Sequence, residues 1–600
     1  MPFQRRLIAA AAAAMVTTPA AAETPDPVQD PVVVTATRTA ETVDSTLAPV
    51  TVLTREDIEQ SQAADLPELL SNRTGIQISH NGGRGKTSSL FLRGTNSDHT
   101  LFLIDGQRVG SATSGGAAFQ DIPPEIIERV EVVRGPRASL YGADAIGGVV
   151  NIITRKGETA HLRVGGGRYN TREASMGVGI QEGNSRLRMD ASFANTDGFD
   201  ATEDQTDGND DVDGYENRSL NLHAGHDFGP VELGLDYYRT NAENEYDGGG
   251  DSYQKSNRDA AKFRAAFAPA AIWESEVSIG SNRDDEDTYS GDTVISNYTT
   301  ERTTAHWQND FILSAQQMLT AGLDYYEDSV EETTTQYDES RRYNRAGYLQ
   351  YQWMGERLDV QASGRWDDNE AYGENTTGQA AIGWRLNETT RLIASHGTAF
   401  KAPTFNDLYY PGFGGLYAGN PDLKAEESRT TDLGIRLRQG ATRVAVTAFR
   451  TEVDDLIDYT DDFSQTTNIN EASIRGVETE VGLTGEDWNL DLSITSLDTE
   501  NEETGDSLDR RADLTWRIEG ERRVGDWRFG GGLEHQGARP DGTATLGAYT
   551  LARVRAAWEV TEQFTVRSRI ENLTDADYQL ADGYNTAGKS AYGEVVWRLR

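Results

Sequence analysis

Asp30-Pro31-Val32-Val33-Val34-Thr35-Ala36 opens the stretch that decides the fold, which runs on to Gly148-Val149-Val150-Asn151-Ile152-Ile153-Thr154. Between these two segments, short apolar runs alternate with Gly and Asn turns, a pattern typical of a compact α/β unit. One helix is predicted over residues 55–70, with Thr54 and Asp57 forming a capping box at its start. The pattern by itself fits binding modules of many kinds.

A second pattern, with a period of two residues, begins after Thr154 and continues to the end of the chain. In residues 231–237 the apolar side chains of Val231, Leu233, Leu235 and Tyr237 alternate with Glu232, Gly234 and Asp236. Residues 358–366, 488–495 and 564–570 repeat this alternation. Such strands either coat a soluble sandwich or face lipid. Charged residues on the second face favour a hydrated lumen, and Trp or Tyr near strand ends favours interfacial girdles.

Composition limits the protein classes that remain. The chain has 60 Gly against 16 Pro, 24 Tyr, 10 Trp and 36% apolar residues, which suits many strands and turns. No apolar run of about 18 residues follows the N-terminus, so a helical membrane span is excluded. The absence of Cys excludes a disulfide framework and thiolate chemistry. The net charge of −41 argues against a nucleic-acid partner.

The N-terminus has the features of an export signal. Arg5 and Arg6 precede an apolar run over residues 7–16, and small residues lead to Ala22. This order predicts a signal peptide over residues 1–22 that is cleaved after Ala22. The polar residues that follow, with Pro25 and Pro27, predict a periplasmic tail.

Several segments carry a resemblance to a known family. Asp30 to Ala36, Asn81-Gly82-Gly83, Arg93-Gly94-Thr95-Asn96 and Arg134-Gly135-Pro136 occur in the order found in the plug of TonB-dependent outer-membrane receptors. Residues 394–403 and 571–575 resemble barrel signatures of that family. Among its members, the chain is most similar to the cobalamin transporters. The resemblance therefore covers nearly the whole chain, and it is weakest in the loops between Thr159 and Leu392.

The resemblance implies a 22-stranded antiparallel transmembrane β-barrel occluded by an N-terminal α/β plug domain. The roughly 450 residues after Thr154 would give about 20 residues to each strand with its connection, which suits lipid-crossing strands. The implied organisation is a signal peptide (1–22), a tail with the TonB box (23–40), a plug (41–155) and a barrel with extracellular loops (156–600). The predicted location is the bacterial outer membrane, in contact with its lipid and lipopolysaccharide.

The implied function is active import rather than catalysis. Cobalamin or a related corrinoid would bind outside, and TonB of the inner membrane would pair with the TonB box and pull. From the residues alone, the short β-prone string in this box fits an ordinary first plug strand or a strand that a partner extends. The predicted TonB box residues are Asp30, Pro31, Val32, Val33, Val34, Thr35 and Ala36. No HExxH pair and no phosphate-binding loop occurs.

Long polar stretches at residues 195–218, 241–258, 284–296 and 409–426 are predicted as extracellular loops. Within them the resemblance implies a calcium site, because carboxylate oxygens are ligands that Ca²⁺ prefers. From composition alone, the same residues are typical of solvated loops. An EF-hand is excluded because Leu220 occupies the position where that motif requires Glu. The predicted calcium ligands are Asp200, Asp211, Asp213, Asp247 and Asp251.

Substrate contacts are predicted on the plug apices and one loop. Arg84 and Lys86 add positive charge there, which leaves an anionic ferric siderophore as the alternative substrate. A third hypothesis is a secreted, calcium-stabilised β-sandwich enzyme or adhesin, which leaves the plug resemblance unexplained. The predicted contacts are Asn81, Gly82, Gly83, Arg84, Lys86, Asn96, Ser111, Thr113, Tyr409 and Tyr410.

The two Arg-Gly motifs are predicted to anchor the plug in the barrel. The resemblance implies that Arg93 and Arg134 pair with barrel carboxylates, of which Glu478 is the first candidate. A buried pair of this kind would fix registry more than stability. The alternative is that each arginine only caps a turn.

Overall fold

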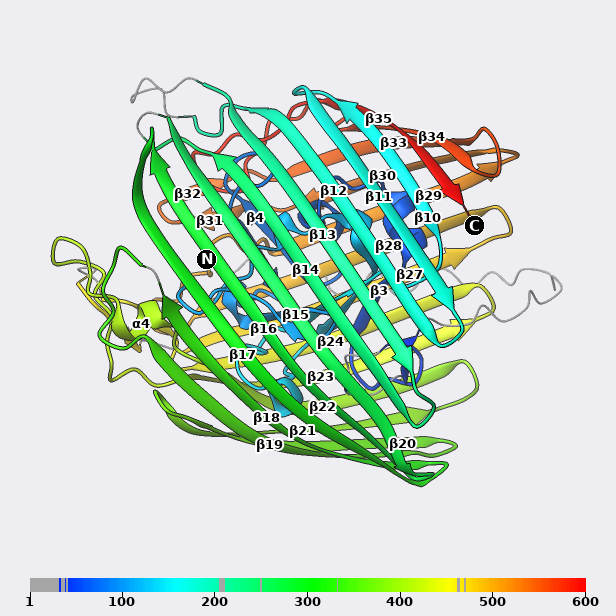
Figure 1. Cartoon of the computed structure of the whole chain (residues 1–600), viewed down its shortest axis with the longest axis vertical. Coiled ribbons are helices and arrows are strands. Elements are labelled where there is room, and N and C mark those ends of the chain that lie inside the picture. The colour runs from blue at the N-terminus through cyan, green and yellow to red at the C-terminus, as the bar shows by residue number, and fades with distance from the viewer. Residues whose placement is uncertain are drawn as a thin grey trace, which may run out of the picture.

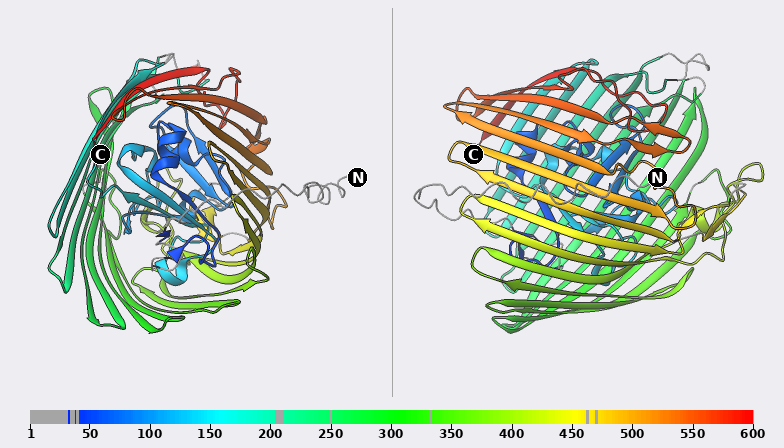
Figure 2. Two further views of the ribbon diagram at one scale, coloured as in Figure 1. Left: turned by 90° about the vertical axis from the view of Figure 1, so that its right-hand side faces the viewer. Right: turned by 180° about the vertical axis from the view of Figure 1, so that it is seen from behind.

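The chain forms a closed barrel of 22 strands with an N-terminal domain inside it (Figure 1). The computed structural model describes residues 32–33, 38, 41–203, 211–248, 251–331, 333–460, 464–468 and 471–599. Neighbouring barrel strands are antiparallel, and the first, β10, pairs with the last, β35, from Ala160–Leu599 to Gly167–Tyr592. Figure 2 shows the N-terminal domain in the lumen. The predicted fold is confirmed, and the soluble sandwich is wrong because the sheet closes on itself.

Short turns join the barrel strands at one end and longer connections join most of them at the other. This asymmetry is typical of outer-membrane barrels, in which the short turns face the periplasm. The barrel strands are β10 (Ala160–Gly167), β11 (Thr171–Glu182), β12 (Ser185–Phe199), β13 (Asp213–Asp227), β14 (Val231–Glu245), β15 (Ser252–Ala270), β16 (Trp273–Ser290), β17 (Thr293–Ser314), β18 (Gln317–Glu331), β19 (Arg341–Met354), β20 (Leu358–Asn369), β21 (Gly373–Arg385), β22 (Thr390–Lys401), β23 (Glu426–Gln439), β24 (Thr442–Asp454), β27 (Ala472–Thr484), β28 (Trp488–Asn501), β29 (Leu514–Val524), β30 (Trp527–Gln536), β33 (Tyr549–Glu559), β34 (Phe564–Glu571) and β35 (Ser590–Leu599).

Alternation along these strands separates an apolar outer face from a polar lumen. Leu162 and Val164 of β10 are exposed on the outside, whereas Arg188 and Asp190 of β12 are buried and paired inside. Aromatic residues gather near the short turns, where the rings of Trp527 and Trp558 stack with centres 5.3 Å apart. Such a girdle marks the membrane interface.

One predicted extracellular loop, residues 284–296, is mostly strand. β16 and β17 continue their ladder through pairs such as Asp285–Thr299 and are joined by a two-residue turn. The polar residues mislead because antiparallel strands can pair beyond the bilayer, where neither face meets lipid. Strands also extend into the predicted loops at 195–218 and 241–258. β12 ends at Phe199 and β13 begins at Asp213, whereas β14 ends at Glu245 and β15 begins at Ser252.

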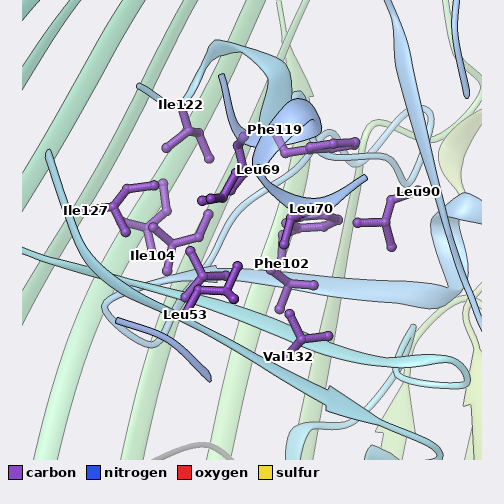
Figure 3. Packing of buried hydrophobic residues seen from close by; sticks show 14 of the residues in the cluster. Leu53, Leu69, Leu70, Leu90, Phe102, Ile104, Phe119, Ile122, Ile127 and Val132 are labelled. Atoms are coloured by element: carbon purple, nitrogen blue, oxygen red, sulfur yellow. The ribbon is translucent and has the colours of Figure 1, made fainter. Parts of the chain in front are cut away.

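The plug has a five-stranded sheet in the order β3-β8-β9-β6-β7, with β6 and β9 parallel, and a separate β4–β5 hairpin. Helices and sheet enclose an apolar core in which Leu69, Leu70 and Ile127 are fully buried and the rings of Phe102 and Phe119 stack at 5.0 Å (Figure 3). The plug elements are β3 (Val50–Leu53), α1 (Arg55–Ser61), α2 (Leu66–Leu70), β4 (Ile76–His80), β5 (Ser88–Leu92), η1 (Ser97–His99), β6 (Thr100–Ile104), β7 (Gln107–Arg108), η2 (Phe119–Asp121), η3 (Pro124–Ile126), β8 (Ile127–Arg134), α3 (Ala138–Tyr141) and β9 (Gly148–Thr154).

The single helix predicted over residues 55–70 is two helices. The Thr54–Asp57 capping box is present, but α1 ends where Gln62 adopts a left-handed conformation with φ of 53°. A new N-cap follows at Asp65, whose side chain accepts from Glu68 N, and Pro67 lies in the first turn of α2. None of the helices among the described residues is long and apolar enough to cross a bilayer.

Short elements complete the structure. β1 (Val32–Val33) pairs with β2 (Glu41–Thr42) ahead of the plug sheet. α4 (Phe405–Tyr409) lies in the connection between β22 and β23, and two small strand pairs lie in other connections: β25 (Ile457–Tyr459) with β26 (Thr466–Asn468), and β31 (Arg539–Asp541) with β32 (Ala544–Leu546).

Candidate functional site: the plug apices, their anchors and the acidic loops

Arg93 joins the plug to two barrel strands. Its Nε and Nη2 donate to the two carboxylate oxygens of Glu478 on β27, both at 2.8 Å, and its Nη1 donates to Asp432 Oδ1 on β23 at 2.6 Å. Burial lowers the pKa of such a guanidinium, but the two carboxylates outweigh it and raise the pKa of Arg93 above its usual value. The fully buried side chain therefore remains charged and bidentate to Glu478.

Arg134 is held beside Arg93 but mainly by another carboxylate. Its Nη2 donates to Glu480 Oε1 at 2.9 Å, whereas Glu478 Oε2 lies 3.4 Å from its Nε. Arg134 Nη1 also donates to Thr51 Oγ1 and to the carbonyl of Thr74, both in the plug. Only Glu478 was predicted from the sequence; Asp432 and Glu480 were missed because many barrel strands carry acidic residues.

Close packing around the Arg93–Glu478 pair explains why residue 75 is a glycine. Gly75 has φ of +72°, and a Cβ built there would lie 2.4 Å from Glu478 Oε1. Any side chain at this position would therefore displace the carboxylate that receives Arg93.

The first plug loop, residues 81–87, lies against the barrel wall. A Cβ built on Gly82 would lie 2.8 Å from Ala201 Cβ, one on Gly83 would lie 3.2 Å from the Phe199 ring, and one on Gly85 would lie 2.0 Å from the ring of Tyr215. The predicted substrate residues Gly82 and Gly83 thus bring the loop to the wall, while Asn81 is only half-buried. Glycine permits close backbone approach, and here the neighbour is the barrel wall.

The two cations of this loop are bound within the protein. Arg84 Nη1 pairs with Glu173 Oε1 of β11 at 2.5 Å, and its Nη2 donates to the carbonyl of Ala64 at 2.7 Å. Lys86 is 2% exposed and donates to barrel oxygens of β13 and β14. Burial lowers the pKa of Lys86 to about 8, against the charges of nearby carboxylates. The structure gives these predicted substrate residues protein partners.

The second plug loop, residues 109–116, packs against α4. Phe405 N donates to Ala112 O, and Asn406 N donates to Thr113 O at 3.2 Å. Of the predicted contacts here, Ser111 and Thr113 are buried and bonded to each other through their hydroxyls at 2.7 Å.

The predicted aromatic contacts lie next to this loop. Tyr409 packs on Phe405, and Tyr410 packs on Tyr337, with ring centres 5.9 and 6.3 Å apart. Both tyrosines are half-buried. They lie close to the second plug loop, as the prediction requires, because α4 carries them there.

Asn96, the remaining predicted contact, faces the barrel. Its Oδ1 accepts from Arg511 Nη2 at 2.6 Å, and Arg511 Nε donates to Gly94 O at 3.1 Å. Arg511 had no sequence signal that set it apart from the other lumen arginines.

Three of the five predicted calcium ligands come together. Carboxylate oxygens of Asp200, Asp213 and Asp247 lie within 4.8 Å of one another, from the ends of β12, β13 and β14. Asp211 and Asp251 are outside this group. The hard oxygen donors fit Ca²⁺ in kind, and three carboxylates leave the rest of its six to eight ligands to other oxygens.

The predicted TonB box lies almost wholly outside the described residues: Asp30, Pro31, Val34, Thr35 and Ala36 are not described. The backbone of Val32 and Val33 pairs with β2. Two residues after the box, Arg38 lies 3.5 Å from Asp324 and 3.2 Å from the Tyr348 hydroxyl of the barrel wall. No motif in the sequence sets Arg38 apart from the other arginines.

Comparisons with known proteins agree with this architecture. The family described as "TonB dependent receptor-like, beta-barrel" matches residues 156–573, and "TonB-dependent Receptor Plug Domain" matches residues 42–149. The vitamin B12 transporter BtuB of Photobacterium profundum is 33% identical over 592 residues, which cover 95% of this chain and 96% of that protein. BtuB of Vibrio vulnificus is 31% identical over 593 residues, 94% of each chain.

Solved structures show the same fold. The siderophore receptor PirA of Acinetobacter baumannii superposes with a TM-score of 0.80 at 19% identity, covering 92% of this chain and 98% of that one. A mutant of the ferric enterobactin receptor PfeA of Pseudomonas aeruginosa gives 0.81 at 20% identity, covering 95% and 100%. The chain belongs to the TonB-dependent receptor family and is an integral outer-membrane protein.

Proposed function

We propose that the protein imports cobalamin, or a closely related corrinoid, across the outer membrane with energy delivered by TonB. Relatives named as vitamin B12 transporters, 31–33% identical over nearly the full length of both chains, support this substrate. The siderophore receptors are 19–20% identical and support the fold alone.

The observation that carries the choice is the disposition of the apical cations. An anionic ferric siderophore requires positive side chains that face the ligand, and Arg84 and Lys86 were the first candidates. Arg84 is paired with Glu173, and Lys86 is bound by four barrel oxygens. With both cations engaged in the wall, these two residues no longer argue for an anionic ligand, and half-buried Asn81, Tyr409 and Tyr410 suit the amide rim and the faces of a corrin ring.

The acidic loops are proposed to bind calcium. Asp200, Asp213 and Asp247 would hold the ion, and its charge would draw together the connections that follow β12 and β14. Ordered loops lower the entropy cost of binding a bulky substrate. The further ligands Asp211 and Asp251 remain predictions.

Energy coupling is proposed to act through residues 30–36. TonB would add a strand to this segment and pull on it, and the plug would then shift in the barrel and open a path. The same proposal includes export by a signal peptide cleaved after Ala22, so that N-terminal sequencing of the mature protein should begin at Glu23. Val33→Pro removes a backbone donor. It should preserve substrate binding but abolish uptake, and normal uptake would contradict this coupling.

Direct binding tests the substrate. Cyanocobalamin and a ferric catecholate siderophore should each be titrated against the detergent-purified protein, in calcium and in EGTA. We expect cyanocobalamin to bind, more tightly in calcium, and the siderophore not to compete. Asp213→Asn should remove most of the calcium effect, with Asp211→Asn as the matched control that retains more of it. Siderophore binding without cyanocobalamin binding would overturn the proposal.

A further inference from the structure

Lys86 places a cation from the plug at the root of the acidic loops. Its ammonium lies 2.8 Å from Asn244 Oδ1 and 2.5, 3.2 and 3.2 Å from the carbonyl oxygens of Glu245, Asp213 and Gly214, so its three N–H groups are shared among four acceptors. Four neutral oxygens around one positive charge resemble the donor set of a bound metal ion. The side chain is 2% exposed, so bulk solvent does not reach the contacts in this cage of oxygens.

The cage lies where the ladder between two barrel strands stops. β13 and β14 pair up to Tyr215–Asn244, and the caged carbonyls belong to the residues immediately beyond that pair. Beyond the pair, the Gly214 amide also bonds to the Glu245 carboxylate at 2.7 Å. Lys86 therefore joins the two strands outside their ladder, with a charge-assisted set of hydrogen bonds.

The same residues lead into the acidic group. Asp213 offers its carbonyl to Lys86 and its carboxylate to the group with Asp200 and Asp247, and Asp247 follows Glu245 by two residues. The Asp213 carboxylate also accepts from Ala201 N at 2.7 Å, which ties β12 to this point. A plug cation and the proposed calcium position thus share the ends of β13 and β14, and the acidic group adds Asp200 at the end of β12.

We propose that Lys86 is a resident cation of the substrate loops: its ammonium holds the outer ends of β13 and β14 against the plug without metal. Calcium then strengthens an order that already exists. The plug also gains a direct connection to the loops, so that movement of residues 81–87 withdraws the cation and loosens the strand ends. The calcium part of this inference rests on the proposed function; the metal-free part does not.

Hydrogen exchange tests the metal-free part. The full-length protein in detergent should be followed by mass spectrometry in EGTA, in peptides covering 213–217 and 241–246. We expect Lys86→Gln to raise exchange there at least about tenfold over wild type. Arg84→Gln is the matched control, since it removes a charge from the same loop but contacts Glu173 and Ala64. Wild-type exchange in Lys86→Gln, or equal acceleration in Arg84→Gln, would overturn the inference.

Calcium tests whether a metal can replace the ammonium. Added calcium should return Lys86→Gln to within about twofold of wild type, which a misfolded variant would not do; persistent fast exchange would overturn the shared action. Calorimetric titration of the wild-type protein with calcium tests the calcium proposal separately. If calcium did not bind, that proposal would be wrong, but the comparison of variants in EGTA would still be valid. If Lys86→Gln lacks the heat-modifiable gel mobility of a folded barrel, Asn244→Ala is used in its place. Asn244→Ala should accelerate hydrogen exchange in the same peptides, though less than Lys86→Gln. Exchange equal to that of wild type would contradict the inference.

Discussion

The plug core and the plug–barrel interface differ in their chemistry, although small apolar clusters also cross the interface, such as the one that contains Ile146 of the plug and Phe400 of β22. The core is apolar, and Leu66, Leu69 and Leu70 have no exposed surface. At the interface, barrel cations bond to plug carbonyls: Arg517 to Ser71, Lys262 to Asp105, Arg511 to Gly94 and Arg391 to Ser45, at 2.7 to 3.2 Å. Water can replace such polar partners one at a time, whereas it cannot replace apolar packing.

This difference in chemistry indicates whether the plug core or the plug–barrel interface gives way first when force is applied to the plug. Each fully buried core side chain contributes about 1.5–3 kcal/mol, and core contacts are lost together. A typical hydrogen bond contributes about 0.5–1.5 kcal/mol, and interface bonds can be lost in sequence. We therefore expect the plug to shift along its polar wall while its own core stays packed.

The largest expected effect follows from breaking the core. Leu70→Asp places an unpaired charge among fully buried side chains and should cost more than about 4 kcal/mol, enough to unfold the plug. All ten tryptophans lie at or after Trp273 in the barrel, so barrel fluorescence should be unchanged while plug amides exchange freely and cyanocobalamin binding is lost. Leu70→Met is the control, with a cost below about 1.5 kcal/mol. Retained protection of plug amides in Leu70→Asp would contradict the contrast.

An intermediate effect is expected at the buried anchor. Glu478→Gln leaves Asp432 as the only carboxylate bonded to Arg93 and should lower the opening free energy of amides in β4 and β5 by about 3 kcal/mol. Native-state hydrogen exchange measures this quantity. A change below about 1 kcal/mol would show that the anchor is dispensable for plug order.

The smallest effect is expected at the neighbouring carboxylate. The Glu480 side chain is 31% exposed. When its charge is removed, Arg134 still contacts Thr51, Thr74 and Glu478. Glu480→Gln should therefore lower the same opening free energy by about 1 kcal/mol or less. An equal loss of opening free energy in Glu480→Gln and Glu478→Gln would show that burial does not determine how much each carboxylate contributes.

Much of the fold could be predicted because its signals are local or repeated. Period-two alternation predicted strands with one apolar face, the family resemblance predicted the closed barrel, and Thr54 with Asp57 predicted a helix start. The break between α1 and α2 was missed because the apolar face continues from Ile58 to Leu70 across the left-handed Gln62. The extent of β16 and β17 was missed because polar residues pair as readily as apolar ones outside the bilayer.

The site was predictable in its segments and less so in its partners. Asp200, Asp213 and Asp247 meet because three strand ends adjoin in the barrel, and Asp211, only two residues from Asp213, does not join them. The burial of Arg84 and Lys86 depends on Glu173 and on carbonyls of β13 and β14, which are about 90 to 160 residues away in the chain. No local pattern carries that information.

The central claim is that the plug moves against the barrel wall during transport. Ser139 of α3 and Ser363 of β20 have hydroxyl oxygens 2.8 Å apart, and the chain has no Cys, so a Ser139→Cys and Ser363→Cys pair can form one defined cross-link. The decisive measurement is uptake of radiolabelled cyanocobalamin by cells carrying the oxidised pair, with each single variant as control. The account predicts normal binding, no uptake, and recovery on reduction; full uptake by completely cross-linked protein would contradict it.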